Sequence, residues 1–203
     1  MKSKIILRLC VFALVIALLM VGCTSNQVAL GPSDHNNLVP ALGLSKEEAC
    51  KVIGIEQEQM TEFVIQTYST PLKAELAGQT FDVILSFDAL SEKEELLQIM
   101  YRAIYEDQSD TTAQAVKAVV ETLEEQYGEP SRRSNSWDEA APIPEGYTYW
   151  DLTETVSQEL SAYMKQLEEQ YGGSAYYQLS LQISLEENEC VVTMKYVVGV
   201  NPA

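Results

Sequence analysis

The stretch YQLSLQISLEENECVVTMKYVVG (residues 177–199) predicts a long antiparallel β-hairpin at the centre of a sheet. Apolar and polar residues alternate from Leu179 to Leu185, and the alternation resumes at Cys190 after a tight turn near Glu187. A period of two is typical of strands with one buried face, and a two-residue turn fixes how they pair. The expected pairs are Leu185 with Cys190, Ile183 with Val192, and Leu181 with Met194.

Two segments upstream of this hairpin carry further strand patterns. Residues 61–69 contain many β-branched and aromatic residues, which favours a strand. The stretch PLKAELAGQTFDVILSFD (residues 71–88) predicts a second hairpin with one apolar face. A two-residue turn at Gly78–Gln79 would place Leu76 opposite Phe81.

Residues 95–106 are compatible with two kinds of secondary structure. Apolar and aromatic residues alternate from Leu97 to Tyr105, which favours a strand. The alternative is a helix that follows a capping box formed by Ser91 and Glu94. We predict the strand, because β-branched and aromatic residues and the preceding hairpin both point to it.

The hexapeptide LEEQYG occurs twice and indicates two similar helices, within residues 109–128 and 153–172. In both copies apolar residues are spaced three and four apart, which places them on one stripe of an α-helix. Each copy has a Thr-x-x-Gln capping box and ends in glycine, so we expect helices that start near Thr111 and Thr155. Residues 44–54 predict a shorter capped helix.

These patterns together predict an α+β fold. We expect an antiparallel sheet of about five to seven strands, with two long helices and one short helix packed on one face. We divide the chain into a signal peptide (1–22), a lipidated cysteine with a flexible tether (23–43), and a single domain (44–203). The polar residues, prolines and glycines of the tether place His35, the one histidine of the chain, in a solvated linker.

The first 23 residues have the pattern of an export signal. Lys2, Lys4 and Arg8 precede an apolar run at residues 9–21, which is shorter than the ~20 residues that span a bilayer. The run ends in LLMVGC, which resembles the lipobox of bacterial lipoproteins. The resemblance implies that Cys23 becomes the mature N-terminus and carries a diacylglycerol, which anchors stably. We therefore expect a lipoprotein at the cell membrane, facing outside the cytoplasm.

The charge of the chain restricts its partners. The chain has 30 acidic and 13 basic residues, which gives a formal net charge of −17. A strongly acidic surface repels the phosphates of nucleic acids and anionic lipid headgroups. We expect no nucleic acid partner. The expected partners are the membrane, through the lipid anchor, and an envelope protein or a peptide.

The order of the predicted elements is similar to that of uncharacterised lipoproteins of Gram-positive bacteria. The pattern is helix, strands, a helix ending in YGEP (residues 127–130), and a tryptophan-bearing strand followed by a hairpin. More distantly, it resembles small α+β modules of the β-lactamase-inhibitor-like kind. The resemblance implies a fold and no particular activity. The helix predicted within residues 153–172 is an insertion relative to this pattern.

Cys50 and Cys190 are the cysteines that would accompany Cys23 in the mature protein. Export permits a disulfide between them, and both lie on faces that we predict to be buried. The alternative is a pair of free thiols that pack as small apolar residues.

The sequence contains few residues of the kinds that catalyse reactions. A single histidine argues against most metal sites and histidine-dependent triads, and no phosphate-binding or nucleophile motif occurs. The acidic residues are numerous, but they lie at positions that helices and strands turn toward water. We therefore expect no metal, no cofactor and no enzymatic activity.

The segment APIPEGYTYW (residues 141–150) is the best candidate for a binding surface. Aromatic residues are favoured at interfaces, so Tyr147, Tyr149 and Trp150 are the candidate contact residues. The alternative is that these side chains pack on the sheet as part of a strand. We expect a non-catalytic binding module; the alternatives are a small-ligand carrier at the membrane surface and a hydrolase that uses carboxylates.

Overall fold

The computed structural model describes residues 32–201, so the predicted signal peptide and Cys23 lie outside the described residues. The predicted central hairpin is present as β8 (Ser174–Glu186) and β9 (Glu189–Asn201). Its register is confirmed, because Leu185 pairs with Cys190 and every pair upstream keeps that alignment. The alternating apolar residues of both strands form one buried face.

Nine strands form one sheet around this hairpin. Eight of them follow the order β1-β3-β4-β5-β9-β8-β7-β6, and β2 pairs with the outer edge of β3. The other strands are β1 (Pro32–Asp34), β2 (Thr61–Val64), β3 (Thr67–Leu76), β4 (Gln79–Phe87), β5 (Leu96–Tyr105), β6 (Arg132–Arg133) and β7 (Gly146–Asp151). The strand predicted within residues 95–106 is therefore confirmed as β5.

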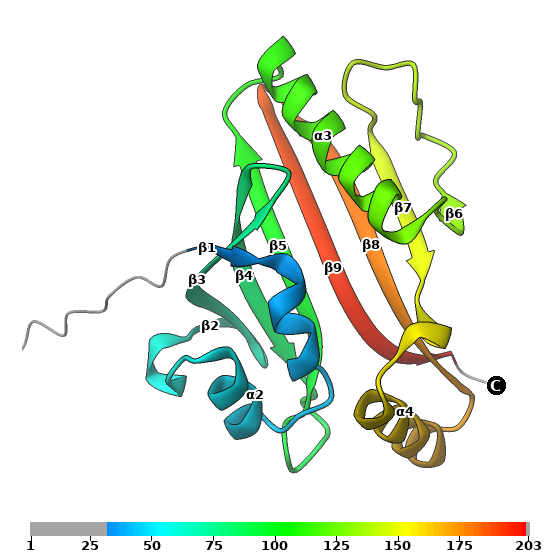
Figure 1. Cartoon of the computed structure of the whole chain (residues 1–203). Coiled ribbons are helices and arrows are strands. Elements are labelled where there is room, and N and C mark those ends of the chain that lie inside the picture. The colour runs from blue at the N-terminus through cyan, green and yellow to red at the C-terminus, as the bar shows by residue number, and fades with distance from the viewer. Residues whose placement is uncertain (1–31, 202–203) are drawn as a thin grey trace, which may run out of the picture.

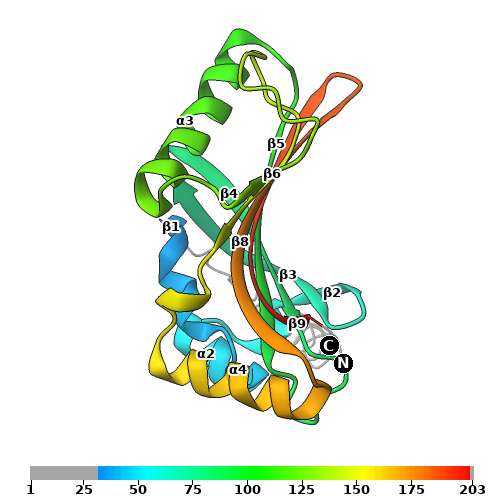
Figure 2. The same ribbon diagram turned by 90° about the vertical axis from the view of Figure 1, so that its right-hand side faces the viewer.

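The helices all lie against one face of the sheet (Figures 1 and 2). The α-helices are α2 (Lys46–Ile53), α3 (Asp110–Tyr127) and α4 (Gln158–Tyr171), and the 3-10 helices are η1 (His35–Ala41), η2 (Gln57–Gln59) and η3 (Thr153–Thr155). Seen edge-on in Figure 2, the sheet is bent, and the face without helices is its concave one. The α+β class is confirmed, and no helix within residues 32–201 is long and apolar enough to cross a membrane.

The sheet differs from the predicted one in size and direction. It has nine strands instead of five to seven, since β1, β2 and β6 are only two to four residues long and carry little alternation. It is also mixed, because β1 runs parallel to β3 while the other described pairs are antiparallel. Short edge strands of this kind are defined by their neighbours more than by their own sequence.

The N-terminal boundary of the domain lies further upstream than predicted. Residues 32–43 were expected to form a flexible tether, but they contain β1 and η1, and His35 is only 3% exposed. Leu38 and Ala41 point into the core, and the hydroxyl of Tyr101 donates a hydrogen bond of 2.6 Å to the carbonyl oxygen of His35. The prediction of a solvated histidine is therefore wrong.

The two long helices begin at different residues from those predicted. Ser109 caps α3 by accepting a hydrogen bond from the N–H of Thr112, and Ser157 caps α4 in the same way. Thr111 instead lies inside the first turn of α3, and Thr155 ends η3. Serine and threonine are both good N-cap residues, so the nearby serines compete equally well for this position. Both helices end at the predicted glycines, whose φ angles are 77° and 70°.

The β3–β4 hairpin forms with a turn one residue earlier than predicted. Ala77 and Gly78 both have positive φ angles, of 52° and 69°, as a type I′ turn requires. Ala74 therefore pairs with Phe81, where the predicted register paired Leu76 with it. Because this register differs by an even number of residues, the same apolar side chains still face the core.

Candidate binding surface

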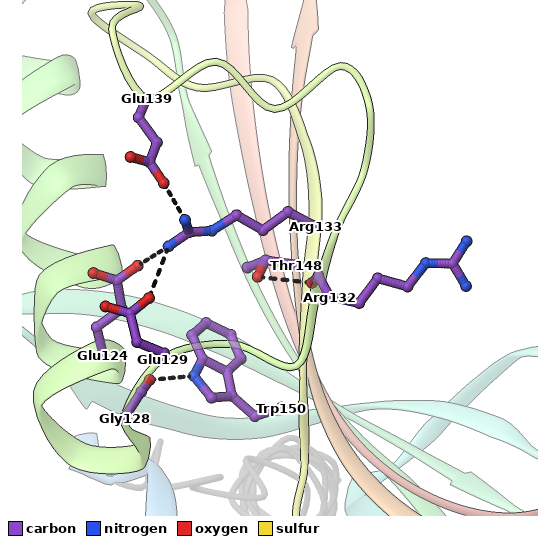
Figure 3. Close-up of polar contacts among 8 residues, drawn as sticks. All are labelled: Glu124, Gly128, Glu129, Arg132, Arg133, Glu139, Thr148 and Trp150. Atoms are coloured by element: carbon purple, nitrogen blue, oxygen red, sulfur yellow. Dashed lines mark hydrogen bonds and ion pairs between the residues drawn. The ribbon is translucent and has the colours of Figure 1, made fainter.

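Strand β7 divides the predicted aromatic segment between the two faces of the sheet. Trp150 faces the helices and is 2% exposed, whereas Tyr147 is 41% exposed and Tyr149 is half-buried on the uncovered face. The indole N–H of Trp150 donates a hydrogen bond of 2.8 Å to the carbonyl oxygen of Gly128, just after α3 (Figure 3). Trp150 is thus a core residue, and it does not belong to the binding surface that the sequence suggested.

The two arginines of β6 are divided in the same way. Arg133 points toward α3 and forms ion pairs with Glu124 at 2.6 Å, Glu129 at 3.9 Å and Glu139 (Figure 3). These contacts join the end of α3 and the loop before β7 to the sheet edge. Figure 3 shows the side chain of Arg132 extending away from α3, and this residue is exposed. Arg132 therefore presents its charge on the uncovered face.

The uncovered face carries a hollow of about 400 Å³ beside these residues. The rings of Tyr147 and Tyr149 lie 5.2 Å apart at its rim, and the register sets Tyr149 opposite Ser180 of β8. We call the lining residues the tyrosine surface. They are Ser131, Arg132, Tyr147, Tyr149, Asp151, Tyr176, Gln178 and Asn201.

The charge of the uncovered face differs from that of the whole chain. Its outward positions on β3 to β9 carry four basic residues and five acidic ones, although the chain has 30 acidic and 13 basic residues. The basic residues are Lys73, Arg102, Arg132 and Lys195, and the acidic ones are Glu75, Asp82, Asp151, Glu186 and Glu189. The excess negative charge therefore lies on the helices and loops, and the uncovered face is nearly balanced.

An aromatic cluster fills the space between the sheet and the helices. The ring of Tyr196 lies 6.1–6.5 Å from those of Tyr101, Tyr127, Tyr177 and His35. Burial lowers the pKa of His35 from its ordinary value, because the charged imidazolium is disfavoured away from water, although the carboxylate of Asp34 opposes this effect. The cluster makes this part of the molecule a packed core.

A second hollow, of about 630 Å³, opens between η1 and the start of α4 on the helix side. Its walls are mostly apolar, and its floor contains the hydroxyls of Tyr127 and Tyr196, which lie 2.6 Å apart. Both hydroxyls also lie within 3.0 Å of the side-chain oxygen of Asn36. This size falls within the range of small-molecule pockets. The floor groups, however, already bond one another.

A hydrolase that uses carboxyl groups needs, among those of residues 32–201, one whose pKa is raised. Where their pKa departs from its ordinary value, it is lowered, because hydroxyl and backbone N–H groups donate hydrogen bonds to the carboxylate. Within residues 32–201, no three His, Cys, Asp or Glu side chains gather as a metal site would require.

Cys50 and Cys190 are both free and buried. Cys190 pairs with Tyr105 at one end of β5, whereas α2, which carries Cys50, begins beside Glu95 at the other end. Ten residues of strand separate these ends by about 30 Å, and a disulfide needs Cα atoms within about 7 Å. The structure therefore contradicts the disulfide and agrees with the alternative of two free thiols.

We expect both core thiols to resist alkylation in the folded protein at about pH 8. Burial raises the pKa of Cys190 to about 11 and also raises that of Cys50, and both thiols are shielded. Mass spectrometry should find them labelled at least about a hundredfold more slowly than a cysteine introduced at the exposed Ile104. After unfolding without reductant, Cys50 and Cys190 should both react. If both stayed unlabelled in the unfolded, unreduced protein, they would be joined by a disulfide.

The tyrosine surface was only partly predictable. Tyr147 and Tyr149 were found through the composition of their segment, whereas Arg132 and Tyr176 were missed because they come from other strands. The one sequence signal for them is the polar row that alternates with the apolar row of β8, at Gln178, Ser180 and Gln182. Such a row indicates an exposed face but does not say what gathers on it.

No protein family, no curated protein and no solved structure matches this chain. The geometry of residues 32–201 and the leader of the sequence are therefore the two indications of its function.

Proposed function

We propose that the protein is a lipid-anchored binding module that holds a polypeptide partner outside the cytoplasm through the uncovered face of its sheet. The observation that carries this proposal is the tyrosine surface, which lies on a concave face that no helix covers. Tyrosine and arginine are the residues that contribute most to protein interfaces, and Tyr147, Tyr149, Tyr176 and Arg132 gather here.

The chemistry of this face fits a polypeptide better than a nucleic acid. Side-chain amides and hydroxyls stand beside the aromatic rings, so the surface offers both donors and acceptors to a peptide backbone. Its near balance of charge admits either sign of partner, while the acidic helix side repels anionic molecules. A negatively charged polypeptide would therefore be guided toward the uncovered face.

The anchor in this proposal is the diacylglycerol on Cys23, inferred from the leader and its lipobox-like ending. With this anchor the module stays at the outer surface of the membrane, since two acyl chains hold a protein stably where one binds marginally.

The alternative function is a carrier of a small apolar molecule. It is favoured by the hollow of about 630 Å³ between η1 and α4, whose walls are mostly apolar. We rank it second because the hydroxyls on its floor are already paired with Asn36 and with each other.

Cross-linking in living cells tests the proposed function. We expect a photoreactive amino acid at Ser180, next to Tyr149 on the uncovered face, to capture a protein partner. The same amino acid at Glu125, exposed on α3, should capture none.

The partner contact should also depend on the tyrosines. Replacing Tyr147 and Tyr149 with alanine should lower the yield of the cross-link by about tenfold or more. Tyr171→Ala is the matched control, since Tyr171 is similarly exposed but lies at the end of α4, and it should leave the yield unchanged. Capture from position 125 and none from 180 would place the binding surface on the helix side and contradict the proposal.

A further inference from the structure

The turn between β2 and β3 exposes three large apolar side chains in a row. Phe63, Val64 and Ile65 are 57%, 59% and 78% exposed, and we call them the apolar tip. Phe63 and Val64 end β2, an edge strand in which every residue is exposed, and Ile65 follows in the turn. Single exposed apolar residues are normal on a protein surface, but three in sequence at a protruding turn form a small patch.

The apolar tip is held rigidly, although its residues are poor turn formers. Two residues, Ile65 and Gln66, connect the strands, and Gln66 has a φ angle of 55°, where glycine, asparagine or aspartate is preferred. Gln66 accepts a hydrogen bond from the N–H of Phe87 at 2.8 Å and donates one to Glu94 at 2.6 Å. Glu62 also accepts one from its N–H. Ile65 is therefore fixed pointing outward.

The pairing of β1 directs the N-terminal end of this strand toward the apolar tip. β1 runs parallel to β3, with Pro32 opposite Lys73, so the end of β1 at Pro32 faces the Thr67 end of β3 and the tip. Thr67 lies six residues from Lys73, or about 20 Å along the strand. The segment between Cys23 and Pro32 can span at most about 30 Å. A lipid on Cys23 and the tip can thus reach one membrane surface together.

We propose that the apolar tip inserts into the interfacial layer of the membrane that holds the Cys23 lipid, as a second contact that fixes the orientation of the domain. This inference rests on the proposed lipid anchor. Burial of the three apolar side chains favours insertion. Glu62 beside the tip disfavours anionic headgroups, so electrically neutral lipids are the better partner.

A fluorescent label that senses membrane depth tests this contact. The full chain, lipidated in cells, is placed in phosphatidylcholine vesicles with the label on a cysteine at Ile65→Cys. A quencher attached to the lipid chains should reduce its fluorescence by about twofold or more. The control is Ile104→Cys, an exposed isoleucine at the far end of β5, and it should be unaffected. Phe63→Ser with Val64→Thr should weaken quenching at position 65.

The outcomes separate this inference from the proposed function. Mass spectrometry of the same sample shows whether Cys23 carries the lipid, which tests the anchor alone. If Cys23 carries no lipid, the protein can be attached to the vesicles through an N-terminal hexahistidine tag and a nickel-chelating lipid. The insertion of the apolar tip is then tested by the same quenching measurement. Equal quenching at both positions, or none at 65, would overturn the inference. A measurement without vesicles could also overturn it. If the label at position 65 became more shielded from water as the protein concentration rose, a second copy of the chain would be covering the apolar tip.

Discussion

Replacing Trp150 with alanine is expected to lower the free energy of unfolding by about 3–5 kcal/mol. The indole is almost completely buried between β7 and α3, so its removal leaves a cavity in the core. It also leaves the carbonyl oxygen of Gly128 without its hydrogen bond from the indole N–H. Guanidinium unfolding followed by near-UV and far-UV circular dichroism measures the loss.

Two variants separate the cavity from the hydrogen bond. Trp150→Phe keeps an aromatic ring but removes the donor to Gly128, and it should cost about 1–2 kcal/mol. Trp137→Ala removes the other tryptophan, which is half-buried in the loop before β7, and should cost less than Trp150→Ala. If Trp150→Ala cost less than about 1 kcal/mol, Trp150 would be a surface residue. The prediction that Trp150 belongs to a binding surface would then regain support.

The fold was most predictable where one pattern fixes both the element and its pairing. In β8 and β9 the alternation is long and the turn is short, so the register followed directly. In β3 and β4 the alternation was equally clear, but Ala77 takes a positive φ angle that its side chain does not favour. The position of this turn is therefore determined by packing in the folded sheet and not by local sequence preference. The apolar face survived this error, because alternation determines the face more strongly than it determines the register.

The N-terminal part of the domain was not predictable, because its structure depends on distant partners. β1 has three residues and η1 has a period of three, so neither produces a recognisable pattern. The N-terminal part is held in place by distant contacts, such as the hydrogen bond between Tyr101 and the backbone of His35, which are 66 residues apart. The tyrosine surface has the same origin, since the sheet brings β6, β7 and β8 side by side.

Alkaline solution should unfold the protein at about pH 11–12, through its buried tyrosines. Burial raises the pKa of Tyr101, Tyr163, Tyr177 and Tyr196 well above the ordinary value of about 10, because the phenolate is disfavoured away from water. Below about pH 10 these groups are neutral in both states and cost nothing. Above it the unfolded chain loses the four protons while the folded protein keeps them, so stability falls as the pH rises.

The expected effect approaches the whole stability of a typical domain. Each of these four tyrosines lowers the free energy of unfolding by about 1.4 kcal/mol at pH 11, or about 6 kcal/mol together, and domains are stable by about 5–15 kcal/mol. Ultraviolet absorbance at the phenolate band, read with circular dichroism, should show part of the eleven tyrosines ionising only as the fold is lost. Tyr177→Phe keeps the ring against Tyr196 and should reduce the slope of stability with pH by at most about a quarter, because other buried groups such as Tyr105 and Tyr127 also contribute. Tyr147→Phe, on the uncovered face, is the control that should leave the slope unchanged. Reversible ionisation of all eleven with the fold intact would contradict the burial of this cluster.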